Sequence, residues 1–265
     1  MIETKWDRGR VLVIGGSQGA VFSVDIAVKS AMKGGAGLVV ACVPDNVVGT
    51  LESRGGFYKI KGIGKYNNPN GFSDMMSDIV SKSHCIVAGM GIEDDADHIL
   101  PFFGKMLAEI TIPCVVDADL INLICRHPEL LSRRQNKHIA FVLTLNHHET
   151  QNMFGSHEPS EQVVASASRQ FNAWIVLKGA DTKIFSPEGG HHMYSSEKIP
   201  EMAVAGMGDV LSGLIGSFIA QGDDVFHAIQ LALTIRKNAA RYYLDKTGAK
   251  IVLPEDVIAS IPYAR

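Results

Sequence analysis

The chain contains few cysteines, and none of them forms a C-x-x-C pair. The four cysteines are Cys42, Cys85, Cys114 and Cys125. The first three lie inside apolar runs, where a thiol packs as a small hydrophobic side chain. This pattern argues against a disulfide framework and indicates a reducing compartment, so we expect a cytoplasmic protein.

Long apolar segments and a strong charge of one sign are also lacking. The N-terminal segment MIETKWDRGR has no apolar run of the signal-peptide type, and no later run approaches the ~20 residues of a membrane span. The formal net charge is -3, and the lysines and arginines are scattered along the chain. We therefore expect no membrane association and no nucleic-acid partner.

Two common nucleotide-binding motifs are absent. The glycines of GGSQGA (15–20) lack the spacing of the G-x-G-x-x-G dinucleotide fingerprint, and no G-x-x-x-x-G-K-[ST] loop occurs. The pairs His147-His148 and His191-His192 do not indicate a zinc site, because adjacent side chains point apart on a helix or a strand. A nucleotide site in this chain must use another kind of loop.

Short apolar runs, by contrast, are abundant. Of the 265 residues, 46% are hydrophobic and 20% charged, a globular balance that suits one domain over residues 1–265. Apolar runs rich in Val and Ile are typical of parallel strands covered on both faces. These predicted strands are Val11–Ile14, Gly37–Val43, Cys85–Ala88, Cys114–Val116, Phe141–Leu143 and Trp174–Leu177.

Segments of helical period alternate with the predicted strands. Alternation of this kind predicts right-handed crossovers and an α/β fold, a three-layer α/β/α sandwich with a mainly parallel central sheet. Lys183–Ser186 and His192–Tyr194 are expected to form a hairpin. The predicted helices are Asp25–Lys33, Phe72–Ser81, Ala96–Glu109, Glu161–Gln170, Asp209–Ala220 and Val225–Leu244.

The strongest functional motif is AVAGMGDVLSG (203–213), a glycine loop that runs into an apolar helix. Amides at a helix N-terminus lack internal partners and, with the helix dipole, form an anion site. Gly206 and Gly208 allow this backbone to approach a phosphate closely. Asp209 follows at the expected start of the helix, where it is either a helix N-cap or a functional carboxylate.

Three further motifs place polar groups after buried strands, at the edge where α/β sheets bind ligands. Lys178-Gly179 is either a phosphate contact or a strand-ending turn. Glu149 is either a direct or water-mediated Mg²⁺ ligand or the nearby carboxylate of a helix cap formed by Thr144 or Asn146. In VVDADLINL (115–123), one of Asp117 and Asp119 is expected to cap the next helix while the other faces the ligand.

In this order, the motifs resemble those of the ADP/ATP-dependent NAD(P)H-hydrate dehydratases, a branch of the ribokinase-like (carbohydrate kinase-like) superfamily. The resemblance extends from Gly9 to Pro262. The segments that carry it are GRVLVIGGS (9–17), GGAGLV (34–39), VAGMGI (87–92), VVDADLINL (115–123), LKGADT (177–182) and MAVAGMGDVLSGLIGSFIAQG (202–222).

The resemblance implies a metabolite-repair lyase of ribokinase-like fold. ATP or ADP, with Mg²⁺, phosphorylates the hydroxyl of the hydrated nicotinamide ring of NADHX or NADPHX, and loss of phosphate restores NAD(P)H. Asp209 would be the catalytic base. An anion hole would be formed by Gly206, Met207 and Gly208, and Glu149 would hold Mg²⁺. The nucleotide would be contacted by Lys178, Gly179, Ala180, Asp181, Thr182 and Gly208. The substrate would be contacted by Ser23, Gly91, Asp119, Asn146 and Asp209.

The sequence departs from the family mainly on the substrate side. Phe22-Ser23-Val24 replaces a Gly-Ala-Pro-like segment, Asn146 replaces a His, and a His-Gly pair is missing from the stretch 233–238. Two other interpretations are open: a small-molecule kinase acting on a vitamin-like alcohol or sugar, which Asn146-x-x-Glu149 favours, and a regulatory nucleotide-binding protein without catalysis, which Asp209 disfavours. The resemblance also implies a homo-oligomer, and the length of the chain leads us to expect the associated NAD(P)HX epimerase as a separate protein.

Overall fold

The computed structural model describes residues 4–68, 70–92, 97–179, 181–195 and 198–264. Within these residues the chain forms a nine-stranded sheet of order β3-β2-β1-β4-β5-β6-β7-β8-β9. The strands are β1 Arg10–Ile14, β2 Leu38–Val43, β3 Lys59–Gly62, β4 Cys85–Ala88, β5 Cys114–Asp117, β6 Phe141–Leu145, β7 Trp174–Leu177, β8 Asp181–Phe185 and β9 His191–Ser195. The pairs from β3 to β7 are parallel, and β7-β8 and β8-β9 are antiparallel. The predicted α/β fold with a mainly parallel sheet is confirmed.

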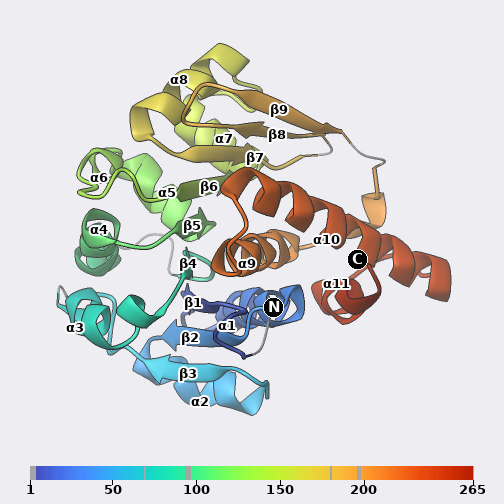
Figure 1. Ribbon diagram of the computed structural model, residues 1–265, viewed down its shortest axis with the longest axis horizontal. Helices are drawn as coiled ribbons and strands as arrows, with labels where there is room; N and C mark the ends of the chain where they lie inside the picture. The colour runs from blue at the N-terminus through green and yellow to red at the C-terminus, as the bar shows by residue number, and fades with distance from the viewer. Residues whose placement is uncertain (1–3, 69, 93–96, 180, 196–197, 265) are drawn as a thin grey trace.

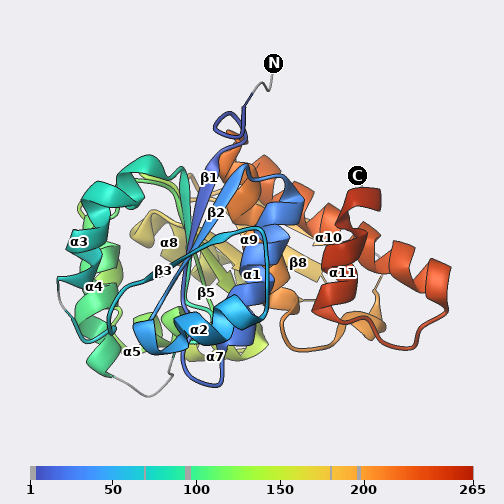
Figure 2. The same ribbon diagram turned by 90° about the horizontal axis from the view of Figure 1, so that it is seen from below.

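Helices cover both faces of the sheet and complete three layers (Figure 1). On one face lie α1 Val21–Gly34, α2 Asp45–Ser53, α9 Met207–Ala220, α10 Val225–Thr247 and α11 Pro254–Ser260. On the other lie α3 Gly71–Asp78, α4 Leu100–Glu109, α5 Asp119–Arg126, α6 Glu129–Ser132, α7 His147–Phe154 and α8 Glu161–Phe171. Figure 2 shows the same separation from a second direction, with α3 and α4 across the sheet from α10 and α11. None of the helices described combines the length and the apolar character needed to cross a membrane.

Two hydrophobic cores fill the spaces between the layers, because successive side chains of a strand point to opposite faces. In β1, Val11 and Val13 pack toward α9, whereas Leu12 and Ile14 pack toward the other helical layer. Helix α9 is buried along almost its whole length. It packs closely against α1, since a Cβ at Gly213 would lie 2.1 Å from the Ser30 Oγ and 2.3 Å from the Ala27 carbonyl oxygen.

Several element boundaries differ from the sequence prediction. Helix α1 begins at Val21 rather than at Asp25, whose buried carboxylate accepts hydrogen bonds from Lys29, Arg54 and Tyr58 at 2.7 to 2.8 Å. Strand β3 was not predicted, because this edge strand is only partly apolar and partly exposed. The β8-β9 hairpin is confirmed. That residues 1–265 form a single domain stays a prediction.

Candidate active site

A polar cavity of about 420 Å³ lies where β5, β6 and β7 end and α9 begins. We call it the Asp209 cavity. Parallel strands end at the same edge of the sheet, so their terminal side chains converge there. The lining residues are Asp117, Ala118, Asn146, Glu149, Lys178, Gly179, Val204, Ala205, Gly206, Met207, Gly208, Asp209 and Arg236.

The glycine loop leads into α9, and the uncapped N-terminus of this helix lies at the cavity. Helix α9 begins at Met207, and its N-cap residue Gly206 makes no side-chain cap hydrogen bond. Gly206 has φ +91°, and a Cβ there would lie 2.8 Å from Pro254 and 2.9 Å from Phe22. Asp209 is the third helical residue, so the interpretation of Asp209 as the N-cap is wrong. The first amides of α9 therefore remain available to an anion.

Asp209 is buried at the wall of the cavity, with 8% of its surface exposed. Burial raises the pKa of its carboxyl to about 8, and the charge of Asp117 adds to the rise. A side-chain hydrogen bond with Ser23 and the charge of Lys178 oppose it. A carboxyl that titrates near neutral pH beside a ligand cavity is suited to general-base chemistry.

Lys178 and Asp117 form the ionic centre of the site. The Lys178 Nζ lies 2.5 Å from the Asp117 Oδ1 and 3.8 Å from the Glu149 Oε2. The Ser212 hydroxyl donates to the Asp117 Oδ2 at 2.5 Å. Burial works to lower the pKa of Lys178, but Asp117 and Glu149 raise it above its ordinary value, so the side chain stays an ammonium. A Cβ at Gly208 would lie 3.3 Å from the same Nζ, which places this cation beside the start of α9.

The turn after β5 positions Asp117 through an unusual backbone conformation. Ala118 has φ 54° and ψ −128°, one of two non-glycine residues with positive φ in the described chain. Its amide donates to the Asp117 Oδ1 at 2.8 Å. Such conformations cost about 1 to 3 kcal/mol and tend to occur at functional sites. The sequence carried no signal for this strain.

Asn146 and Glu149 form a complete capping box at the start of α7. The Asn146 Oδ1 accepts from the Glu149 amide at 2.9 Å, and the Glu149 carboxylate accepts from the Asn146 amide and Nδ2, each at 2.7 Å. The capping interpretation of this pair is confirmed, and both residues also line the cavity. Burial raises the pKa of Glu149 to about 7, and Asp117 adds to the rise, against the effects of Lys178 and Asn146.

The oxygen atoms that line the Asp209 cavity suit a Mg²⁺ ion that is bound mainly by the phosphates of a ligand and by water. The described residues contain no group of three or more His, Cys, Asp or Glu side chains that would hold a metal. Both oxygens of Glu149 already accept hydrogen bonds from Asn146. Because Mg²⁺ usually keeps several waters and binds one or two carboxylates together with substrate phosphates, Glu149 suits a contact through water.

Other residues singled out by the sequence lie around the cavity without lining it. Gly91 has φ 65°, and a Cβ there would lie 2.4 Å from the Ala20 carbonyl oxygen, so Gly91 holds the loop after β4 against the entry to α1. Asp119 is the first residue of α5, and its charge helps raise the pKa of Asp209 and Glu149. Asp181 is exposed at the start of β8, and Ala180 falls outside the described residues.

A second cavity, of about 380 Å³, adjoins the first; we call it the Tyr194 cavity. The two cavities share three lining residues, Gly179, Met207 and Arg236. Thr182, predicted to contact the nucleotide, lies here rather than in the Asp209 cavity. The other lining residues, which the sequence reasoning missed, are Tyr194, Lys198, Ile199, Pro200, Met202, Ala203, Leu233 and Lys237.

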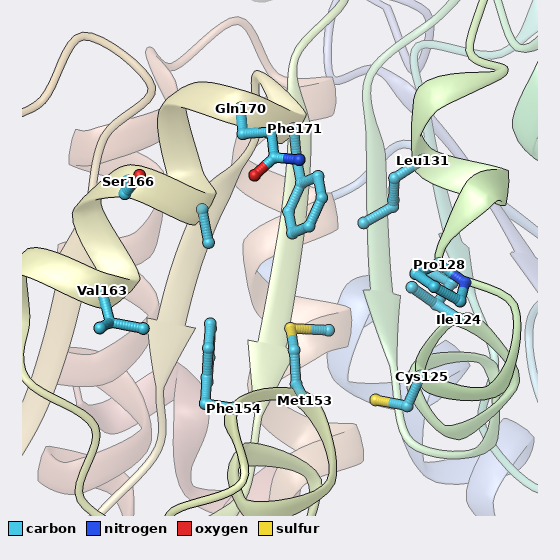
Figure 3. Close-up of a pocket in the computed structure, with 11 residues that line it drawn as sticks. Ile124, Cys125, Pro128, Leu131, Met153, Phe154, Val163, Ser166, Gln170 and Phe171 are labelled. Carbon is cyan, nitrogen blue, oxygen red and sulfur yellow. The ribbon is translucent and has the colours of Figure 1, made fainter.

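A third cavity, of about 450 Å³, lies among the helices of the opposite layer. Figure 3 shows apolar side chains that converge on it from two sides, with Val163 and Phe154 on one side and Leu131 and Ile124 on the other. No charged side chain lines this cavity. It therefore has neither the cations nor the helix N-terminus of the two cavities at the start of α9.

The mainly parallel sheet with its terminal antiparallel hairpin, covered by helices on both faces, matches the ribokinase-like fold of α/β proteins. A ribokinase-like superfamily protein from Enterococcus faecalis superposes with a TM-score of 0.77 at 22% identity, covering 99% of this chain and 88% of that chain. Residues 11–263 match the family model of NAD(P)H-hydrate dehydratase, and the chain belongs to that family.

Two relatives illustrate the match. A bifunctional NAD(P)H-hydrate repair enzyme from Moorella thermoacetica is 29% identical over 265 residues, 96% of this chain and 49% of the relative. The chain thus spans about half the length of this curated relative. An ADP/ATP-dependent NAD(P)H-hydrate dehydratase from Bacillus subtilis, co-crystallized with ATP/Mg²⁺, superposes with a TM-score of 0.78 at 20% identity, covering 99% of this chain and 91% of that chain.

Proposed function

We propose that this protein is a metabolite-repair lyase that dehydrates NADHX or NADPHX to NADH or NADPH at the expense of ATP or ADP. Family membership supports the reaction class. The observation that carries the proposal is the position of Asp209: its buried carboxyl lines a cavity beside the uncapped amides of α9, next to a second cavity of about 380 Å³. A base and an anion site in contact are what phosphoryl transfer to a hydroxyl group requires.

In the first step, Asp209 takes the proton of the ring hydroxyl while the hydroxyl oxygen forms a bond to the terminal phosphorus of the nucleotide. The phosphorus–oxygen bond to the rest of the nucleotide breaks, which releases ADP from ATP or AMP from ADP. The amides of Met207 and Gly208 stabilise negative charge on the transferred phosphoryl group. Lys178, held by Asp117, keeps a positive charge beside the same amides.

In the second step, the carbon–oxygen bond of the phosphorylated ring breaks and inorganic phosphate leaves with the bonding electrons. The ring then loses a proton and regains its double bond. Phosphate is a much better leaving group than hydroxide, so the nucleotide makes the dehydration feasible. We assign Ser23, Gly91, Asp119 and Asn146 to the substrate side of the site.

Mg²⁺ is the cofactor implied by this chemistry, and it would supply neutralising charge to the nucleotide phosphates. Glu149 would hold it through water, since its own oxygens bind Asn146. Thr182, Gly179 and Met207 line the path from the Tyr194 cavity, where we place the nucleoside. Gly208, Ala180 and Asp181 complete the proposed nucleotide contacts.

The kinase alternative loses its distinguishing feature. Asn146-x-x-Glu149 favoured a small-molecule kinase, but the pair forms a capping box, which gives the motif a local structural explanation. A binding protein without catalysis would have no need of a buried carboxyl at the start of α9.

The deciding experiment mixes the full chain with NADHX, Mg²⁺ and either ATP or ADP and follows the return of NADH absorbance. The Asp209→Asn variant is the control. We expect a nucleotide-dependent gain with the natural chain, and a rate roughly 10²–10⁴-fold lower with the variant. Protein that binds nucleotide but returns no NADH would refute the dehydratase assignment, and a stable phosphorylated alcohol in its place would establish a kinase.

Three further proposals accompany this function. We propose a cytoplasmic reaction, consistent with the buried thiols of Cys42, Cys85 and Cys114. We propose an epimerase that interconverts hydrate epimers as a functional partner. We also propose that the chain self-associates, which light scattering on the purified protein would test.

A further inference from the structure

Arg236 stands at the junction of the two cavities. It projects from α10, the helix that packs beside α9, and it lines both the Asp209 cavity and the Tyr194 cavity. The other two residues at this junction are Gly179 and Met207. Any ligand that extends from one cavity into the other must therefore pass the Arg236 side chain.

The guanidinium is fixed at the start of α9 but not neutralised. Its Nη1 donates to the Met207 carbonyl oxygen at 3.0 Å. Its Nε is buried and has no hydrogen-bond partner among the described residues. Within the described chain, two cations line the Asp209 cavity: Lys178 is paired with Asp117, whereas Arg236 pairs with no carboxylate.

An unpartnered Nε alone does not indicate a ligand site, because Arg10 and Arg134 have one as well. The terminal nitrogens of Arg134 donate to the carbonyl oxygens of Phe171, Asn172 and Ile139, so that side chain ties loops together. Arg236 differs because it also lines two cavities and lies beside the free amides of α9.

Arg236 also keeps its charge. Burial lowers its pKa to about 10, while Tyr194 and Asp117 oppose the fall, so the guanidinium is protonated at neutral pH. A fixed cation beside a helix N-terminus adds to the attraction of the helix dipole for an anion, and a guanidinium presents paired donors that match phosphate oxygens.

We propose that Arg236 binds phosphate oxygens of the adenine nucleotide where the chain of phosphates crosses from the Tyr194 cavity into the Asp209 cavity. This proposal rests on the proposed use of a nucleotide, and it adds a phosphate contact from α10 to those of the glycine loop.

The test measures the binding of ADP, MgATP and adenosine to the full chain by calorimetry, without NADHX. For Arg236→Gln we expect a loss of ADP affinity of about tenfold to a hundredfold, equivalent to about 1.4 to 2.8 kcal/mol, and almost unchanged adenosine affinity. Arg236→Lys should restore part of the loss. Lys246→Gln is the matched control, because Lys246 is an exposed cation of the same helix that lines neither the Tyr194 cavity nor the Asp209 cavity.

Unchanged ADP affinity in folded Arg236→Gln protein would overturn the proposal. An equal loss with Lys246→Gln would overturn it too, since the effect would then come from the general charge of α10. If Arg236→Gln does not fold, Arg236→Lys decides: ADP affinity equal to that of the natural chain, or a parallel loss of adenosine affinity, contradicts a phosphate contact. Because the binding experiment contains no NADHX, it tests the nucleotide contact of Arg236 even if the dehydratase assignment fails.

Discussion

Lys178 and Asp117 join the ends of two strands that are not neighbours in the sheet, β7 and β5, through an ion pair of 2.5 Å between Nζ and Oδ1. The side chains are 13% and 2% exposed. Ser212 of α9 donates to the other carboxylate oxygen. One buried network thus ties two strands and α9 together, so the geometry of the Asp209 cavity and the stability of the fold depend on the same contacts.

Breaking this pair from one side should be costly. We expect Lys178→Met to lower the free energy of unfolding by about 3 to 5 kcal/mol, because Asp117 is left as a buried, uncompensated charge. The double variant Lys178→Met/Asp117→Asn should recover much of the loss. Urea unfolding of the two single variants and the double variant measures the coupling; strictly additive effects would contradict it.

The control for this cycle is an exposed ion pair in the same region. Lys183 and Glu161 lie 3.1 Å apart, with side chains 33% and 41% exposed. Lys183→Met should change the free energy of unfolding by less than about 1 kcal/mol.

The pH dependence of the reaction should report Asp209. Its pKa is raised to about 8, and the base works only when ionised, so kcat/KM should rise with pH through about 8. Asp209→Asn should leave only a low rate without this limb. A profile that is flat or falls between pH 7 and 9 would argue against Asp209 as the base.

Stability should depend on pH in the opposite sense. The folded chain holds the Asp209 proton up to a pKa of about 8, whereas the unfolded chain releases it near the ordinary value of 3.8. Between these values the folded state binds more protons, so the free energy of unfolding should fall as the pH rises. Relative to the natural chain, Asp209→Asn should gain stability from pH 5 to pH 8, which unfolding curves at several pH values would show.

The sequence predicted those parts of the fold and of the site that leave a clear pattern in a short stretch of residues. Apolar runs located the central strands, and Gly206 and Gly208 located the loop that begins α9 and lines the Asp209 cavity, because buried strands and glycine loops leave clear local patterns. The start of α9 was misplaced because Asp209 satisfies the pattern of an N-cap, while the loop geometry gives that position to Gly206. Arg236 was missed for another reason: its role depends on the packing of α10 beside α9, which no local pattern encodes.

The contact between α1 and α9 should not tolerate added volume. Gly213→Ala places a Cβ 2.1 Å from the Ser30 Oγ and 2.3 Å from the Ala27 carbonyl oxygen, so the helices must move apart. We expect overpacking to cost about 1 to 3 kcal/mol in the free energy of unfolding. Since α9 carries Asp209 and the anion site, activity should fall as well.

Gly49 is the matched control for this substitution. It lies within α2, and a Cβ there meets nothing within 4 Å. Gly49→Ala should therefore stabilise the protein by up to about 1 kcal/mol through helix propensity. Equal thermal shifts for the two variants would show that the α1–α9 packing does not limit the site.

Ser23 should tune the base without supplying chemistry. Its side-chain hydrogen bond favours the ionised form of Asp209 and works against the rise in pKa. In Ser23→Ala the pKa of Asp209 should therefore rise further, and the ascending limb of kcat/KM should move to higher pH. At a pH well above the limb, the rate of the variant should level off, and any remaining deficit there measures the loss of the proposed substrate contact of Ser23. Ser30→Ala, on the same helix, should leave the limb in place, because the Ser30 hydroxyl donates to the Ala27 carbonyl oxygen. If the rising part of the kcat/KM profile of Ser23→Ala stays at the same pH or moves to lower pH, Ser23 does not lower the pKa of Asp209.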